Sequence, residues 1–227
     1  STIWSQRADA PTDDGYIAIA AGCQHSVALN KDGRVVTWGG NGRFQRHGAP
    51  TDTGYVAIAC GVYQSIALHR DGRVVIWGHD SHRDGAPTDA GYVAIATGSF
   101  HCVALSKKDG RVVTWGDNSE SQRDGAPTDT GYVAIACGSY HSIALRDDGR
   151  VISWGSNRNN HRADAPTDTG YIAIAAGEYH SVALNKDGRV VSWGSNRNNH
   201  RADAPTDTGY IAIAAGEYHS VALNKDR

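Results

Sequence analysis

A tyrosine followed by alternating isoleucine (or valine) and alanine recurs six times along the 227-residue chain. Successive copies are 39, 37, 40, 39 and 39 residues apart, and a tryptophan recurs in step with them. The tyrosines are Tyr16, Tyr55, Tyr92, Tyr132, Tyr171 and Tyr210, and the tryptophans are Trp4, Trp38, Trp77, Trp115, Trp154 and Trp193. Because the repeat fills the chain, we expect a single domain over residues 1–227, built from six copies of one unit of about 39 residues.

Three short segments within each repeat alternate with a period of two. In the fifth repeat they are residues 171–175, 180–184 and 189–193. This periodicity indicates β-strands, because a helix would need a 3.6-residue period. The Asp187-Gly188 pair between the second and third segments tolerates positive φ and predicts a hairpin. The remaining stretch leaves room for a short outer strand, so each repeat should form three or four strands.

Short antiparallel strands in a repeat of this length are typical of a β-propeller blade, whereas helical solenoids need longer segments with helical periodicity. The last repeat stops near residue 224, before its hairpin turn, and residues 1–4 match the third strand of the other repeats. We therefore predict an all-β, six-bladed β-propeller. Residues 2–5 should pair antiparallel with about 219–224, so that residues 1–5 complete the last blade and no sheet edge stays exposed.

Charge and hydropathy exclude several classes of partner. The chain has 22 Lys and Arg against 24 Asp and Glu, a formal net charge of −2, and no run of five like charges. Binding to nucleic acid is therefore not expected, because it depends on an excess of basic side chains. No stretch approaches the ~18 apolar residues of a membrane span, so membrane insertion is not expected either.

The four cysteines, Cys23, Cys60, Cys102 and Cys137, lack the CxxC spacing of zinc sites and redox pairs. Cys60 and Cys137 occupy a repeat position that holds Ala or Thr in other copies. This exchange with small residues predicts free thiols in a reducing compartment. We expect a cytoplasmic protein, with secretion left open because a cleaved precursor could begin in the same way.

The recurring string Gly-x-Tyr-His-Ser-Val-Ala-Leu-x-x-Asp-Gly-Arg-Val-Val-x-Trp-Gly resembles the regulator of chromosome condensation repeat, particularly its short bacterial version. The resemblance implies a propeller, but it specifies function poorly, since this family includes a nucleotide exchange factor, a plant UV-B photoreceptor and a β-lactamase inhibitor protein. In the inhibitor branch, the aromatic residue before the histidine lies on the partner-binding face. The matching residues here are Tyr63, Phe100, Tyr140, Tyr179 and Tyr218.

The histidine of this string recurs in five repeats, at His25, His101, His141, His180 and His219, and Gln64 replaces it in the second. A catalytic or metal-binding role is one interpretation. Hydrogen bonding between strands explains a repeated group better, since an active site needs different groups that converge once, and glutamine can also form hydrogen bonds. The tryptophans similarly fit packing between blades, with exposure for ligand stacking as the alternative.

No pattern for enzyme chemistry is present. His79-x-x-His82 has metal-ligand spacing but no third ligand nearby, and the nucleophile elbow, phosphate loop and His-Glu-x-x-His motif are absent. We therefore predict a protein that is not an enzyme and needs no metal or cofactor.

Residues 156–187 and 195–226 have the same sequence and should present the same surface twice, with Tyr179 and Tyr218 in identical environments. Repeated weak sites suit a multivalent glycan ligand. We expect a lectin-like, carbohydrate-binding protein; the alternative is a protein–protein interaction scaffold or protein inhibitor, which would favour diverged loops. The loop residues could equally be only solvated. The predicted ligand-binding residues are Tyr63, Phe100, Tyr140, Tyr179, Tyr218, Glu178, Glu217, Arg158, His161, Arg197 and His200.

Overall fold

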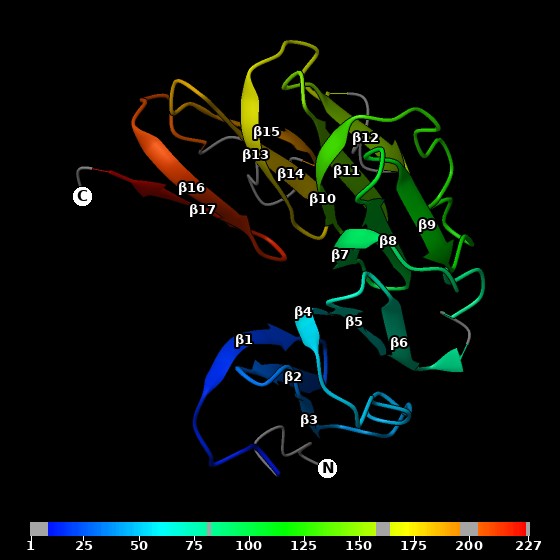
Figure 1. The fold of residues 1–227 in the computed structure, drawn as a ribbon. Coiled ribbons are helices and arrows are strands. Elements are labelled where there is room, and N and C mark those ends of the chain that lie inside the picture. The colour runs from blue at the N-terminus through cyan, green and yellow to red at the C-terminus, as the bar shows by residue number, and fades with distance from the viewer. Residues whose placement is uncertain (1–8, 81–82, 158–163, 196–203, 226–227) are drawn as a thin grey trace. The chain divides into compact units, whose positions relative to one another are not determined.

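A computed structural model describes residues 9–80, 83–157, 164–195 and 204–225. Within these ranges the regular structure is β-strand (Figure 1), and no helix there is long and apolar enough to cross a membrane. The all-β prediction is therefore confirmed.

The strands form one antiparallel sheet per repeat, paired in sequence order. The first sheet contains β1 (Tyr16–Ala21), β2 (His25–Asn30) and β3 (Val35–Gly39); the second, β4 (Tyr55–Cys60), β5 (Gln64–His69) and β6 (Val74–Gly78); the third, β7 (Tyr92–Thr97), β8 (His101–Ser106) and β9 (Val112–Gly116); the fourth, β10 (Tyr132–Cys137), β11 (His141–Arg146) and β12 (Val151–Gly155); the fifth, β13 (Tyr171–Ala176), β14 (His180–Asn185) and β15 (Val190–Gly194); the sixth, β16 (Tyr210–Ala215) and β17 (Ser220–Asn224). Three strands per repeat are thus confirmed for five sheets, while the sixth has two among the described residues.

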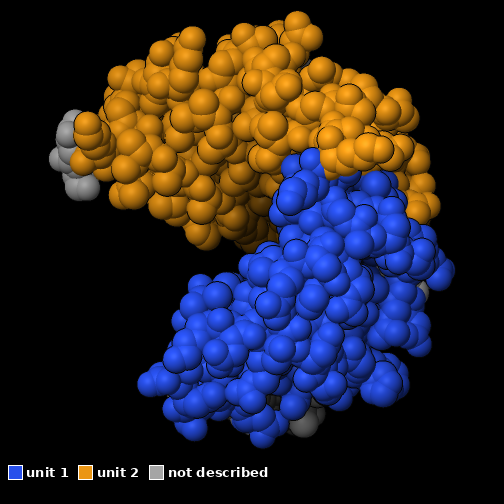
Figure 2. Space-filling view, viewed as in Figure 1, with its two compact units in different colours: residues 1–107, 113–117 blue, residues 108–112, 118–227 orange. Residues whose placement is uncertain are grey.

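The chain divides into two compact units, which Figure 2 shows in different colours. The first consists of residues 1–107 and 113–117, and the second of residues 108–112 and 118–227. The first unit holds the first two sheets and most of the third, and the second unit holds the last three. A single domain over residues 1–227 stays a prediction.

The Asp-Gly hairpin turn forms as predicted. Gly33 has a φ of 76°, and the Asn30 side-chain oxygen accepts hydrogen bonds from the backbone N–H groups of Asp32 and Arg34 at 3.0 and 2.8 Å. The Gly33 carbonyl also accepts a hydrogen bond from the Tyr55 N–H at 3.0 Å. The turn therefore closes the β2–β3 hairpin and also joins it to the next sheet.

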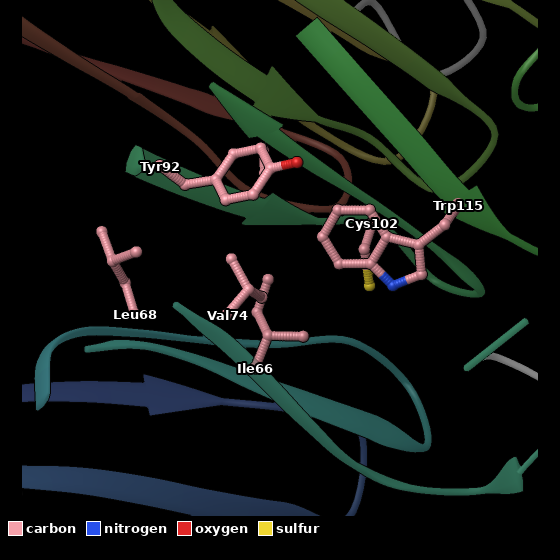
Figure 3. Packing of buried hydrophobic residues seen from close by; sticks show 7 residues of the cluster. Ile66, Leu68, Val74, Tyr92, Cys102 and Trp115 are labelled. Carbon is pink, nitrogen blue, oxygen red and sulfur yellow. The ribbon is translucent and has the colours of Figure 1, made fainter. Parts of the chain in front are cut away.

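Apolar side chains pack between neighbouring sheets. In the first unit, β4 lies against β1 and β2, and β7 lies against β4 and β5. Figure 3 shows the second of these interfaces, where Trp115 and Tyr92 of the third sheet pack with Ile66, Leu68 and Val74 of the second. Trp77 and Trp193 each pack in the same way against the preceding sheet. The prediction that these tryptophans pack between blades is confirmed, and truncating such a side chain typically costs about 3–5 kcal/mol.

The first and last sheets expose apolar side chains that are covered in the other sheets. Ile19 of β1 is 80% exposed and Val221 of β17 is 58% exposed, whereas Val27, which occupies the position of Val221 in the first sheet, is fully buried. Residues 1–5, which the sequence assigns to the last sheet, lie outside the described residues. Ring closure and the number of blades therefore stay predictions.

Candidate functional site

The predicted aromatic contact residues lie in the turn between the first and second strands of the second to sixth sheets. In the fifth sheet, the Gly177 N–H donates to the His180 carbonyl at 2.8 Å and closes this turn. A Cβ atom on Gly177 would lie 2.4 Å from the Gly216 carbonyl oxygen, so only glycine fits there. Glu178 and Tyr179 stand between these residues and remain partly exposed.

The histidine that ends the same turn points into the protein. His25 is buried, and its Nε2 atom lies 2.7 Å from the Ser65 Oγ atom of the next sheet. Burial lowers the pKa of His25 to about 4, so the ring is neutral near pH 7. His141 and His180 make the same contact with Ser181 and Ser220. The predicted hydrogen-bonding role is confirmed for these histidines. Because they are buried, they are not part of the surface that a ligand could contact.

In the first unit, aromatic side chains of these turns meet side chains from the loops that follow the third strands. The rings of Tyr63 and Phe100 are 6.1 Å apart, and the His79 ring is 6.5 Å from Tyr63. The Arg43 guanidinium carbon lies 5.2 Å from the centre of the Tyr63 ring, a cation–π distance. Two of the predicted contact residues are therefore together, with the Arg43 guanidinium beside them.

In the second unit, the same turns carry tyrosines and carboxylates. The Tyr140 and Tyr179 rings are stacked with centroids 6.0 Å apart and planes 25° apart. The Glu178 carboxyl is within hydrogen-bonding reach of the Tyr179 hydroxyl and the Glu217 carboxyl. Partial burial, together with the Glu217 carboxyl, raises the pKa of Glu178. The structure thus brings Tyr140, Glu178, Tyr179 and Glu217 together, and this region is acidic.

The two identical repeat segments do not give their tyrosines identical environments, so that prediction was wrong. Tyr179 is half-buried and stacks on Tyr140 of the preceding sheet, whereas Tyr218 is 49% exposed. A hydrogen bond to Glu217 raises the pKa of Tyr218 to about 12. The difference has a tertiary cause, because the environment of each ring depends on the sheet beside it.

The other predicted contact residues, Arg158, His161, Arg197 and His200, lie outside the described residues, as does His82. Among the residues that are described, no group of three or more His, Cys, Asp or Glu side chains is placed to hold a metal ion. The described surface therefore offers aromatic faces and charges for contact with a ligand.

The model of the regulator of chromosome condensation (RCC1) repeat matches the sequence at residues 16–45, 55–83, 92–122, 132–160 and 171–199, which is more than half of the chain. The chain belongs to the RCC1 repeat family. The predicted family resemblance is thereby confirmed, with five matched copies where the sequence periodicity indicates six. Comparison of this RCC1-repeat chain with curated proteins gave no match.

Solved structures with a similar fold include the ectodomain of the receptor kinase CR4 from the moss Physcomitrella patens, at 21% identity and a TM-score of 0.78, covering 93% of this chain and 62% of that one. The chain therefore spans less than two thirds of the CR4 ectodomain. The ectodomain of ACR4 from Arabidopsis thaliana has 25% identity and a TM-score of 0.72, with 92% and 75% covered. Prp20p from Saccharomyces cerevisiae, described with its binding properties toward Gsp1p and histones, has 22% identity and a TM-score of 0.70, with 92% and 70% covered.

Arg43 is the site residue that sequence reasoning missed. It lies in the loop after the first sheet, twenty positions before Tyr63 in the chain. The repeat pattern carried no signal for it, because the loops after the third strands differ in sequence between repeats. Its position over Tyr63 follows from the packing of the second sheet on the first.

Proposed function

We propose that this RCC1-repeat chain is a non-catalytic protein-binding module whose partner contacts the turns between the first and second strands of its sheets. The observation that carries this proposal is the clustering of partly exposed aromatic rings at equivalent turns, as the Tyr63–Phe100 and Tyr140–Tyr179 contacts show. Aromatic residues are enriched in protein interfaces and supply much of the binding energy there.

Two further observations support a protein partner. The charge beside the rings differs between the units, with Arg43 next to Tyr63 and Glu178 next to Tyr179. Diverged surroundings suit one folded partner better than a repeated small ligand. Prp20p, which has a similar fold, is described as binding the proteins Gsp1p and histones, and a second solved structure shows yeast RCC1 (Prp20) bound to the protein Kap60.

Carbohydrate binding stays a prediction. Four of its proposed contact residues, Arg158, His161, Arg197 and His200, lie outside the described residues. The described tyrosines fit a sugar ring as well as a protein side chain, so the two functions need an experiment that compares them directly.

The experiment is a parallel screen of the purified chain at low micromolar concentration against a glycan array and a peptide display library. Each hit is measured again with two double variants, Tyr63→Ala/Phe100→Ala and Tyr140→Ala/Tyr179→Ala. Lys31→Ala and Lys186→Ala, at the opposite hairpin ends of the sheets, serve as controls, and circular dichroism checks folding. We expect peptide ligands that bind at least about tenfold more weakly to an aromatic variant and equally well to the controls.

Other outcomes would contradict the proposal. Glycan hits that depend on the tyrosines, with no peptide hits, would establish the carbohydrate alternative. Peptide ligands that bind every variant like the wild type would place the interface elsewhere on the chain.

We also propose that the chain closes into a six-bladed ring, with residues 2–5 as the third strand of the last sheet. Two observations support this: Val221 of β17 is exposed, and the described part of the chain contributes only β16 and β17 to the sixth sheet, so a strand pairing with β17 would give it the three strands of the others. Deleting residues 1–5 should lower the melting temperature and the hydrogen-exchange protection of β17 amides, while deleting residues 226–227 should change neither. An unchanged melting temperature in the first variant would contradict closure.

A further inference from the structure

The loop after the first sheet, residues 40–48 and here called the Phe44 loop, holds an exposed phenylalanine in a strained backbone conformation. Phe44 has a φ of 62°, and its side chain is 62% exposed. Positive φ is unfavourable for a residue with a side chain, and it is uncommon for a bulky one, because the Cβ atom comes close to a backbone carbonyl oxygen. Neither the backbone angle nor burial therefore accounts for a phenylalanine at this position.

The loop after the third sheet, residues 117–125 and here called the Ser121 loop, has the same conformation with a small polar residue at this position. Ser121 has a φ of 60°. In both loops an asparagine carbonyl accepts a hydrogen bond from the N–H of this residue, at 3.1 Å for Phe44 and 3.0 Å for Ser121. A buried glutamine side chain accepts one from the preceding N–H at 2.9 Å in each loop. The asparagines are Asn41 and Asn118, and the glutamines are Gln45 and Gln122.

The aligned position in the last two repeats holds asparagine, at Asn160 and Asn199. Asparagine adopts positive φ more readily than most residues that have a side chain. The loop therefore needs a residue that accepts positive φ, but it does not need an aromatic ring. Because strained residues cluster at functional sites, the exposed ring of Phe44 is a candidate contact for a ligand.

The Phe44 loop and the Ser121 loop carry opposite charge. The Phe44 loop contains two arginines, Arg43 and Arg46, and no Asp or Glu, whereas the Ser121 loop contains one arginine and three acidic residues. Arg46 pairs with the Asp9 carboxylate at 3.3 Å. Arg43 is exposed and forms no ion pair within the part of the chain that the structure describes. A carboxylate of a partner can therefore pair with Arg43, directly beside Phe44.

The Phe44 loop also contacts the aromatic turns of the first unit. The Phe44 and His47 rings are 6.1 Å apart in an edge-to-face arrangement. The Arg43 guanidinium lies over the Tyr63 ring, and Tyr63 lies 6.1 Å from Phe100. Arg43 thus stands between the exposed ring of the loop and two partly exposed rings of the turns, and all these residues belong to the first unit.

We propose that the Phe44 loop binds an acidic segment of the partner protein that carries an aromatic side chain. The partner's ring packs against Phe44, and its neighbouring carboxylates pair with Arg43, since aromatic rings attract one another and arginine donates to a carboxylate while it lies over a ring. Nucleic acid fits less well, because it needs several basic side chains and the chain has a formal net charge of −2. This inference rests on the proposed protein-binding function and names the chemistry of the partner.

The test uses the full chain and four probes. The first is a synthetic peptide with one tryptophan between aspartates and glutamates. The second has alanine in place of the tryptophan, the third has asparagine and glutamine in place of the acidic residues, and the fourth probe is a single-stranded oligothymidine. Binding is followed by the NMR shifts of the Gly42 and Gly48 amides, on either side of Phe44. We expect the acidic tryptophan peptide to bind, and the other three probes to bind at least about tenfold more weakly.

Two pairs of variants compare the loop with matched positions elsewhere. Phe44→Asn should weaken binding of the acidic tryptophan peptide at least about tenfold, whereas Ser121→Asn, at the same position of the other loop, should leave it unchanged. Arg43→Gln should weaken binding by about fivefold. Arg34→Gln removes an exposed arginine at the hairpin end of the same sheet and should leave binding unchanged.

Thermal stability separates a ring kept for binding from one kept for folding. Phe44→Asn should raise the melting temperature by about 2–4 °C, because asparagine tolerates positive φ and the exposed ring contributes little buried area. A ring that the fold requires would give a lower melting temperature when it is replaced. Lower affinity together with higher stability is therefore the expected result.

Four results would overturn the inference: no shift with the acidic tryptophan peptide; equal binding of a peptide without the tryptophan or without the charges; tighter binding of oligothymidine; or a melting temperature that does not rise in Phe44→Asn. The broader function would fail in a different way. A peptide ligand that needs Tyr140 and Tyr179 but binds Phe44→Asn like the wild type would leave the protein-binding function standing and refute only the site at the Phe44 loop.

Discussion

The His25 Nε2 atom lies 2.7 Å from the Ser65 Oγ atom, and the two residues belong to neighbouring sheets 40 positions apart in the chain. The pairs His141–Ser181 and His180–Ser220 repeat this contact at the same distance and the same separation. A buried hydrogen bond between side chains therefore crosses the sheet interface in both units, beside the turns that carry the aromatic residues.

Removing the histidine should destabilise the fold. We expect His25→Ala to lower the free energy of unfolding by about 2 kcal/mol, because it leaves a cavity and removes the partner of the buried Ser65 hydroxyl. His25→Gln should cost less, since Gln64 occupies the equivalent position in the second sheet and donates to Thr97 Oγ1 at 3.1 Å. Urea denaturation of both variants checks this, and equal losses would contradict a role for the hydrogen bond.

Stability should fall with acidity as His25 becomes protonated. Burial lowers the pKa of His25 from 6.5 to about 4, so the folded state binds the proton more weakly than the unfolded state. The contribution of neutral His25 to the free energy of unfolding is complete above about pH 6.5 and is lost as the pH falls toward 4. This change amounts to about 3 kcal/mol for this residue. Denaturation of the wild type and of His25→Gln at several pH values tests the prediction. The wild type should show the steeper loss between pH 6.5 and 4, and parallel curves would contradict it.

Two glycines with similar backbone angles should differ in their tolerance of alanine. Gly15 and Gly33 have φ values of 82° and 76°. A Cβ on Gly15 would meet only the Lys31 side chain, at 3.6 Å, whereas a Cβ on Gly33 would lie 2.6 Å from the Gly54 backbone nitrogen of the next sheet. We expect Gly15→Ala to cost about 1 kcal/mol and Gly33→Ala at least about twice as much. Thermal unfolding of the two variants measures these costs. Equal losses of stability would mean that the hairpin is not closely packed against the next sheet.

The four cysteines should react with a thiol reagent at different rates. None of the four is in a disulfide among the described residues; Cys23 is exposed, and Cys102 is buried. Burial raises the pKa of the Cys60 thiol to about 11 and that of Cys102 to about 12, which suppresses the reactive thiolate. In the native protein Cys23 should react first, and Cys102 should react only after unfolding. Cys23→Ser should remove the fast phase.

Titration after denaturation without reductant should find four thiols. Finding two would indicate a disulfide and would count against the reducing compartment that the sequence favours. The cytoplasmic location stays a prediction.

The repeated sequence pattern was sufficient to predict the strands, the hairpins and the packing of the tryptophans. These features depend on properties within one repeat: alternation with a period of two places side chains on opposite faces of a strand, and Asp-Gly meets the need for positive φ. The six-fold recurrence then implied that each sheet packs against its neighbour. The position of Trp115 confirms this for the interface between the second and third sheets.

The sequence alone determined which residues stand at the exposed turns, but only the tertiary structure decided what surrounds each of them. Tyr179 and Tyr218 lie in identical sequence segments, yet one stacks on Tyr140 and the other is half exposed. Arg43 reaches Tyr63 from a loop whose sequence follows no repeat rule. The physical reason is that strand and turn formation depends on neighbours along the chain, whereas the environment of a surface side chain depends on the sheet packed next to it.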